Sequence, residues 1–294
     1  MLGNAIVYAE AEDAEPEETI VIKWDGHTHT QFCKHGSAAP LREYVARAAA
    51  LGFERYTVTE HPPLPDGWID DPVLTAELAM DRSELPDYLA EVAAVKREYE
   101  GRLDVTVGLE MDYLFESESF TEDVLSEAAS SLEDVIVSVH YLPGRGGMRC
   151  VDYKPEDFQT NLLSYYGTME KVVDAYYDHI EMAVAGAAGW TWRKRLGHVN
   201  LIEKFRTALP PIDEGQIRLR LERLLPRLVE CGVGIDVNTA GLRKATCGKA
   251  YVPEWFMAAC AARGVELVFG SDAHKPDEVG GGWDWYETAR KGAE

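Results

Sequence analysis

The chain has 294 residues, of which 46% are hydrophobic, and a formal net charge of −22. This length and apolar content suit one large core of the kind that α/β barrels build as a single domain. Because so acidic a surface repels the phosphates of nucleic acids and of anionic membranes, we expect neither as a partner. An anionic substrate would need local positive charge, for which bound metal ions are one source.

The chain begins with an acidic segment, residues 1–20, which we expect to be a flexible extension ahead of a folded domain at 21–294. The sequence contains no run as long and apolar as a transmembrane helix, and its N-terminus lacks a signal pattern. The five cysteines form no CxxC pair, so reduced thiols are the simplest interpretation. We therefore predict a cytoplasmic protein, with no indication of its oligomeric state.

Strand-like and helix-like segments alternate along the chain from residue 19 onward. The expected strands are β-rich runs that end in polar residues, and they lie within residues 19–29, 53–61, 103–113, 134–142, 195–202, 233–241 and 265–274. Segments with helical spacing of apolar residues lie at 40–52, 85–101, 121–132, 217–232 and 254–264. A further long helical stretch separates the fourth expected strand from the fifth.

This alternation predicts an α/β fold with a mainly parallel sheet wrapped by helices. About seven β/α units favour a barrel over a doubly wound sheet. The polar residues at the ends of the strands favour the same choice, because barrel enzymes build their sites at the C-terminal ends of their strands.

Seven of the eight histidines lie at or just beyond the end of an expected strand. They are His27, His29, His35, His61, His140, His198 and His274, and two carboxylates, Glu110 and Asp272, share this placement. In extended backbone, residues two apart point to the same face, as do His27 and His29 in "DGHTH". A single histidine is usually a surface or core group, but so many at one rim predict a common site.

Imidazole nitrogen combined with some carboxylate oxygen suits zinc, iron or manganese. Nine ligands are too many for one ion, so we expect two or three divalent ions with a bridging carboxylate. His179 lies in a helical stretch without a neighbouring ligand and is interpreted as structural or exposed. Cys33 lies near His29 and His35 but has no partner at strand-end spacing, so we do not expect it to be a ligand.

An ordered set of motifs resembles the polymerase and histidinol phosphatase (PHP) family of metallophosphoesterases, and within it the histidinol-phosphatase branch. In chain order the motifs are "HTHTQFCKH", "TEH", "GLEMDY", "VSVHYL", "GHVNLIEKF", "NTAGLRK" and "GSDAHKPDEVG". Together they cover nearly all of the chain after the acidic segment. The resemblance implies a distorted (β/α)7 barrel with a trinuclear metal site and a role in histidine biosynthesis.

The resemblance also implies how the ligands are shared among three ions. The three groups are His27, His29 and Asp272 for the first ion, Glu110, His140 and His198 for the second, and His35, His61 and His274 for the third. Glu110 would bridge the first two ions. A hydroxide between these ions would attack phosphorus, because bound metals lower the pKa of water.

Three cations are candidates for holding the phosphate. Arg243, in "NTAGLRK", is the strongest, because a planar guanidinium suits phosphate oxygens, and it is also a candidate catalytic residue. Lys204 and Arg206, in "IEKFR", are weaker candidates.

Histidinol phosphate also carries an amine and an imidazole, so its pocket should offer a carboxylate. Asp112 and Glu60 are both candidates, and either could instead orient a metal-binding histidine. Glu60 is also a candidate catalytic residue, although the family usually has aspartate at this position. The glycine-rich segment after His140, "PGRGGMRC", also differs from the family pattern and could change substrate preference.

The leading hypothesis is hydrolysis of L-histidinol phosphate, and the second is hydrolysis of another small phosphate monoester or diester. An amidohydrolase is a third reading, but such enzymes use fewer histidines and often a carboxylated lysine, whereas Glu110 occupies the bridging position here. Metal storage or sensing is a fourth, and it explains poorly why the ligands are spread over so many strand ends.

Overall fold

The structure, a computed structural model, describes residues 22–292. The acidic extension predicted for residues 1–20 lies outside these residues and stays a prediction. The main sheet has seven strands in the order β1-β2-β3-β4-β7-β8-β9, and every neighbouring pair is parallel. These strands are β1 (Trp24–Asp25), β2 (Arg55–Glu60), β3 (Asp104–Asp112), β4 (Asp134–Ser138), β7 (Arg193–Leu196), β8 (Gly234–Asn238) and β9 (Leu267–Gly270).

Main-chain hydrogen bonds join the two outermost strands, β1 and β9, beyond the ends of their regular pairing. The amide of Gly26 donates to the carbonyl of Phe269 at 2.8 Å, and the amide of Asp272 donates to the carbonyl of His27 at 2.7 Å. A parallel bridge between Thr28 and Ala273 continues this seam. The sheet therefore nearly closes into a barrel, and the predicted distorted (β/α)7 fold in a single domain is confirmed.

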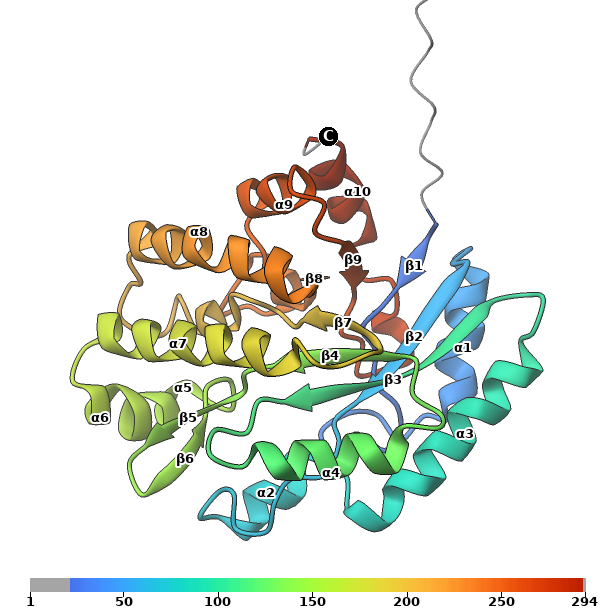
Figure 1. Cartoon of the computed structure of the whole chain (residues 1–294), viewed down its shortest axis with the longest axis horizontal. Coiled ribbons are helices and arrows are strands. Elements are labelled where there is room, and N and C mark those ends of the chain that lie inside the picture. The colour runs from blue at the N-terminus through green and yellow to red at the C-terminus, as the bar shows by residue number, and fades with distance from the viewer. Residues whose placement is uncertain (1–21, 293–294) are drawn as a thin grey trace, which may run out of the picture.

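The helices surround the strands on the outside (Figure 1). Apart from two short helices described below, the α-helices are α1 (Leu41–Ala50), α2 (Pro72–Leu78), α3 (Leu85–Glu98), α4 (Glu118–Ala128), α7 (Met169–Ala187), α8 (Glu214–Cys231), α9 (Glu254–Ala261) and α10 (Trp283–Lys291). Short 3-10 turns lie at Arg82–Glu84, Leu201–Glu203, Ala240–Arg243 and Pro276–Glu278. Within residues 22–292, no helix is both long and apolar enough to cross a bilayer.

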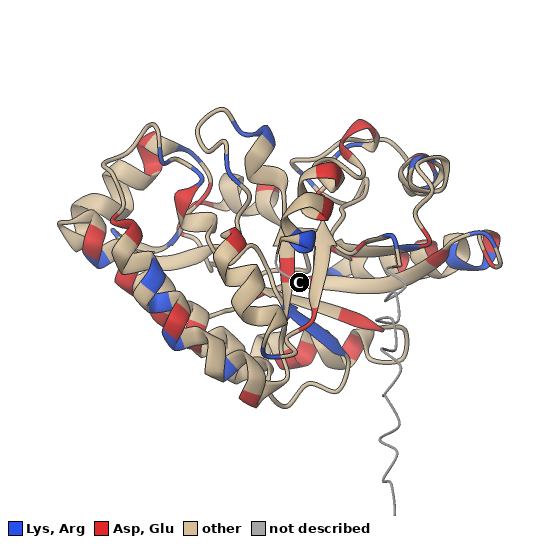
Figure 2. Ribbon diagram, turned by 90° about the horizontal axis from the view of Figure 1, so that it is seen from above, with Lys and Arg blue, Asp and Glu red and all other residues tan. Residues whose placement is uncertain are grey.

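Helix α1 illustrates how the outer layer packs. Its buried residues are Leu41, Tyr44, Val45 and Ala48, which recur at the three- and four-residue spacing of one helical face. Burying a leucine or valine side chain of this kind contributes about 1.5–3 kcal/mol. Acidic and basic residues are interspersed along the outer helices (Figure 2). The spacing of its hydrophobic residues therefore directs α1 onto the sheet.

The connection between β4 and β7 contains a hairpin that the sequence did not predict. Its strands are β5 (Tyr141–Gly144) and β6 (Gly147–Cys150), and it is followed by α5 (Pro155–Asp157), a π-helical turn (Phe158–Leu163) and α6 (Ser164–Tyr166). The glycine-rich segment after His140 therefore forms an ordered antiparallel pair with a tight turn. Gly146 and Gly147 make this turn with φ angles of 78° and 132°, which glycine adopts without strain.

Candidate metal centre

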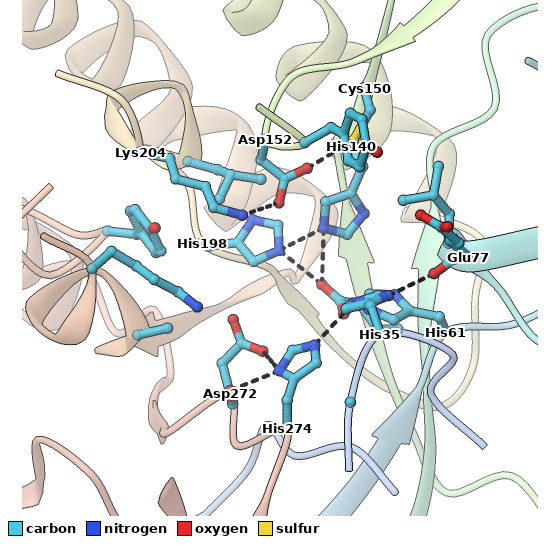
Figure 3. A pocket seen from close by; sticks show the side chains of 18 of the residues that line it. His35, His61, Glu77, His140, Cys150, Asp152, His198, Lys204, Asp272 and His274 are labelled. Carbon is cyan, nitrogen blue, oxygen red and sulfur yellow. Dashed lines mark hydrogen bonds and ion pairs between the residues drawn. The ribbon is translucent and has the colours of Figure 1, made fainter. Parts of the chain in front are cut away.

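The nine predicted ligands lie together at the C-terminal rim of the barrel. Two follow β1, and single ligands come from β2, β3, β4 and β7, because parallel strands in a barrel all end at the same rim. Asp272 and His274 follow β9, and His35 reaches the rim from the loop after β1. Most of the nine line a cavity of about 460 Å³ (Figure 3).

The first group, His27, His29 and Asp272, converges with one oxygen of Glu110. The Nε2 atom of His27 lies 3.1 Å from Oε2 of Glu110, and Nε2 of His29 lies 3.2 Å from Oδ1 of Asp272. The Nε2 atom of His29 is also 3.5 Å from Oε2 of Glu110. Two imidazoles and two carboxylates thus direct their ligand atoms at one point.

The second group, Glu110, His140 and His198, uses the other oxygen of the same carboxylate. The Oε1 atom of Glu110 lies 2.8 Å from Nε2 of His198 and 3.6 Å from Nε2 of His140. Ser138 donates a hydrogen bond to this oxygen at 2.7 Å. Glu110 therefore faces both groups at once, as a bridging ligand must.

The third group, His35, His61 and His274, lies closer to the cavity mouth. The Nε2 atoms of His35 and His274 are 3.1 Å apart, and the rings of His35 and His61 have centroids 5.2 Å apart. Cys33, which the sequence placed outside the site, has its Sγ within 4.8 Å of ligand atoms of His29, His61 and His274. Its position next to this group could not be predicted from strand-end spacing, because it lies in a loop.

Most of the imidazoles are oriented in the same way. In five of them Nδ1 lies within hydrogen-bonding distance of an acceptor oxygen and Nε2 points into the cluster: His27, His29, His35, His140 and His274. A hydrogen bond donated by Nδ1 leaves the lone pair on Nε2, which is the form of imidazole that binds metals.

The donor atoms fit divalent metal ions. The Nε2 atoms of His140 and His198 approach to 3.1 Å, as do those of His35 and His274. Two inward-facing lone pairs repel at this distance unless a proton or a cation lies between them. Within residues 22–292, the buried Nε2 atom of His27 has no partner with hydrogen-bond geometry, although Oε2 of Glu110 lies 3.1 Å away. A set of imidazole nitrogens and carboxylate oxygens suits zinc, iron or manganese.

Two of the candidate carboxylates orient histidines. Glu60, at the end of β2, lies 3.1 Å from Nδ1 of His29 and accepts two further hydrogen bonds from Thr30. Asp112, at the end of β3, lies 2.6 Å from Nδ1 of His140. Both carboxylates are buried behind the imidazoles that they contact.

Asp236 on β8 has the same function for the first group, and the sequence interpretation missed it. Its Oδ2 atom lies 2.8 Å from Nδ1 of His27. The strand pattern could have revealed it, because Asp236 and Asn238 alternate toward one face, and an apolar parallel strand seldom buries two polar residues without a reason.

Charge interactions within the cluster are strong. Burial favours a neutral His140, but the carboxylates of Asp112 and Glu110 outweigh this and raise its pKa to about 10. Burial likewise opposes protonation of His29, whose hydrogen bonds to Asp272 and Glu60 raise its pKa to about 9. Burial alone would raise the pKa of Glu110, but the surrounding histidines hold it well below its usual range. Because metals bind neutral imidazole, a cation must displace protons here.

Two of the predicted ligands have unusual backbone conformations. His198 has a φ angle of 20° and Asp272 a φ angle of 52°, a region that costs non-glycine residues free energy. Strain of this kind persists where the surrounding structure imposes it, most often at functional sites.

A model of the PHP domain matches residues 25–240. The chain belongs to the PHP domain family. It is 38% identical to the histidinol-phosphatase of Bacillus subtilis over 88% of this chain and 96% of that protein. A crystal structure of HisK from Listeria monocytogenes superposes with a TM-score of 0.85 at 32% identity, covering 90% of this chain and all of that one.

A second solved structure shares the fold of this PHP protein. The histidinol phosphate phosphatase of Lactococcus lactis, crystallised with zinc, L-histidinol and phosphate, superposes with a TM-score of 0.69 at 19% identity. The match covers 92% of this chain and 94% of that one. The resemblance inferred from the ordered motifs is therefore confirmed at the level of the family and the fold.

The three cations considered for phosphate binding occupy different places in this PHP domain. Lys204 lines the cavity, and its Nζ lies 2.7 Å from Oδ2 of Asp152. Arg243 and Arg206 are not among the described residues that line it. The guanidinium of Arg243 donates to the carbonyl of Ser271 at 2.7 Å, and Arg206 lies 3.7 Å from Glu203. Phosphate binding by these two arginines stays a prediction.

The cavity also contains residues that the sequence did not single out. Lys244, Tyr251 and Asp152 all contribute to its lining. Lys244 ends the quoted motif "NTAGLRK", whereas Asp152 comes after the unpredicted hairpin and Tyr251 follows a 3-10 turn and a loop.

Proposed function

We propose that this PHP protein is a metal-dependent phosphatase that hydrolyses L-histidinol phosphate to L-histidinol and phosphate. The main structural support is the position of Glu110, whose two carboxylate oxygens each face a different group of imidazoles at the floor of one cavity. The substrate is suggested by the histidinol-phosphatase of Bacillus subtilis, which matches nearly the whole chain.

We further propose three metal sites, one for each of the three ligand groups defined above. Zinc is the first candidate, because the Lactococcus protein was crystallised with it, and iron and manganese suit the same donors. When bound, such ions lower the pKa of water and neutralise charge on phosphoryl oxygens. Glu110 would hold the first two sites at a fixed separation, and Glu60, Asp112 and Asp236 would hold the imidazoles in orientation.

Among the protein's own cations, Lys204 is best placed to contact a phosphoryl oxygen. Its ammonium group is mostly buried at the cavity wall beside the second group. A charge-assisted hydrogen bond from it would oppose the repulsion that a phosphate dianion meets in this acidic protein. Glu110, His140 and His198 lie at the ends of the neighbouring strands β3, β4 and β7, which would hold this part of the site in a fixed geometry.

The predicted cytoplasmic location remains part of the proposal. All five cysteines are free thiols, and four of them are buried. This is the usual condition of cysteines in a reducing compartment.

The test is a panel of phosphate esters assayed together with elemental analysis of the purified protein. L-histidinol phosphate should exceed sugar and nucleotide monoesters in kcat/KM by about 100-fold or more, the scale expected when buried polar groups lose their partners. His140→Ala should abolish turnover, whereas His179→Ala, which changes the one histidine outside the cluster, should retain it. A higher kcat/KM for any other ester would refute the proposal.

A further inference from the structure

L-histidinol phosphate carries its ammonium group close to the reacting centre. The nitrogen is separated from the ester oxygen by three covalent bonds, so the two atoms lie within about 4 Å of each other. A carboxylate that recognises the ammonium must therefore stand beside the metal ligands, and it must not already be engaged by an imidazole.

The two carboxylates suggested by the sequence do not meet this condition. Glu60 is fully buried and held by His29 and Thr30, and Asp112 is 3% exposed and bonded to His140. Neither can turn toward a ligand without releasing the histidine that it orients.

Asp152 does meet the condition. It follows strand β6, lines the cavity, and lies next to His140 and His198 (Figure 3). Its side chain is 21% exposed, so one edge is open to a ligand. The ammonium group of Lys204, 2.7 Å from Oδ2, favours the charged form of this carboxylate.

The present partners of Asp152 can be exchanged. Its Oδ2 accepts a hydrogen bond from Lys204 at 2.7 Å and its Oδ1 accepts one from the thiol of Cys150 at 3.0 Å. Lys204 has a long flexible side chain, and a primary ammonium on the substrate offers the same charge and the same donors. Both side chains of this ion pair are 21% exposed and line the cavity, so a ligand can reach either partner.

The other carboxylates of the cavity are less suitable. Glu278 accepts a hydrogen bond from the amide of His274 and lies 3.7 Å from Nζ of Lys275. Glu77 is exposed, and it contacts the cluster through its main-chain carbonyl, which is bonded to His35. An exposed carboxylate contributes little, because water screens its charge.

We propose that Asp152 receives the ammonium group of L-histidinol phosphate and thereby determines the preference for amine-bearing esters, an inference that rests on the proposed function. Lys204, displaced from Asp152, then donates to the phosphoryl group. The substrate's ammonium group replaces Lys204 as the partner of Asp152, and its phosphoryl group replaces Asp152 as the partner of Lys204. No charge is therefore left unpaired in the cavity.

The test compares L-histidinol phosphate with 3-(imidazol-4-yl)propyl phosphate, the same ester without its amine. The ratio of their kcat/KM values should fall by about 10- to 100-fold in Asp152→Asn, the range expected for one charge-assisted hydrogen bond. Asp152→Glu should restore part of the ratio. The control Glu77→Gln, which removes another cavity carboxylate, should keep the wild-type ratio.

The outcomes separate this inference from the proposed function. A wild-type ratio in Asp152→Asn, in a protein that hydrolyses L-histidinol phosphate, would overturn the role of Asp152 alone. Failure of the wild-type protein to hydrolyse L-histidinol phosphate would overturn both proposals. If Asp152→Asn does not fold, competition in the wild-type protein decides: L-histidinol must inhibit at least tenfold more strongly than 3-(imidazol-4-yl)propan-1-ol, and equal inhibition would overturn the inference.

Discussion

The carboxylate of Asp236 lies 2.8 Å from Nδ1 of His27, so a residue on β8 orients a histidine that follows β1. The same Oδ2 atom accepts hydrogen bonds from the amide of His198 at 3.3 Å and from the side chain of Asn238 at 3.2 Å. Asp236 therefore supports ligands of two different groups. Because it is buried, no water competes for these bonds.

Replacing Asp236 with asparagine should weaken metal binding without unfolding the barrel. Asparagine fills the same volume but removes the negative charge that favours the Nδ1–H tautomer of His27. We expect metal affinity to fall by about 10- to 100-fold, the usual cost of losing a carboxylate behind a metal-binding histidine. Calorimetric titration of the chelator-treated protein with zinc measures this. Asp277→Asn, an exposed carboxylate near the site, is the control, and equal affinities in all three proteins would contradict the prediction.

Gly270, the last residue of β9, is required by the close packing between Asp236 and His27. A Cβ atom at this position would collide with Oδ1 of Asp236 and would lie 2.8 Å from Cβ of His27. Gly270→Ala should lower the free energy of unfolding by about 1–3 kcal/mol, the usual cost of overpacking, and should also weaken metal binding. Denaturant titration and metal titration give the two quantities.

The control for this prediction is a glycine with open space around it. Gly186 lies in helix α7, and no atom stands within 4 Å of the position that its Cβ would take. Gly186→Ala should leave metal binding unchanged and should raise stability by up to about 1 kcal/mol through helix propensity. Similar losses of stability in both variants would show that Gly270 has no special role.

The ligand cluster could be predicted from the sequence because its geometry follows from topology. Once seven parallel strands close into a barrel, every strand end lies at one rim, so His61, Glu110 and His198 must meet although they are far apart in sequence. Assigning these residues to one cluster required only the position of each residue relative to its strand.

Side chains outside this regular pattern could not be predicted in the same way. Asp152 reaches the cavity only because the preceding segment folds into a hairpin, and short antiparallel strands with glycine turns have weak sequence signals. The sequence ranked Arg243 above Lys204 as a phosphate ligand, because a planar guanidinium suits phosphate oxygens. The directions of the side chains could not be predicted: that of Arg243 is fixed by the main-chain carbonyl of Ser271, whereas Lys204 lines the cavity.

Removing bound metal should destabilise the protein as well as inactivate it. A ligand that binds only the folded state stabilises it by about 2.7 kcal/mol at a concentration 100 times its Kd. Treatment with a chelator should therefore lower the Tm and abolish phosphatase activity, and adding zinc or manganese should restore both. In His140→Ala the shift in Tm on adding metal should be smaller, because one ligand is missing. An unchanged Tm on chelation would count against metal sites built from these residues.

His179, the histidine outside the cluster, should make folding sensitive to acid. It is buried against the rings of Phe115 and Tyr113, and its Nδ1 donates to the carbonyl of Ala175 at 2.7 Å. Burial lowers the pKa of His179 below its ordinary value of 6.5, only partly opposed by this hydrogen bond. Below that value the unfolded chain therefore binds more protons than the folded one, so the free energy of unfolding falls as the pH falls.

The variant His179→Leu removes this titration and keeps an apolar side chain against the same rings. The free energies of unfolding of the wild-type protein and the variant, at equal metal content, should be compared between about pH 7.5 and about pH 5.5. Because the seven cluster histidines are common to both proteins, their contribution cancels in the difference. The difference, wild type minus variant, should fall as the pH falls, since only the wild type has to accommodate a proton at this position. A difference that stays constant across this range would mean that His179 has the same pKa in the folded and unfolded chains. Its burial would then have no effect on its protonation.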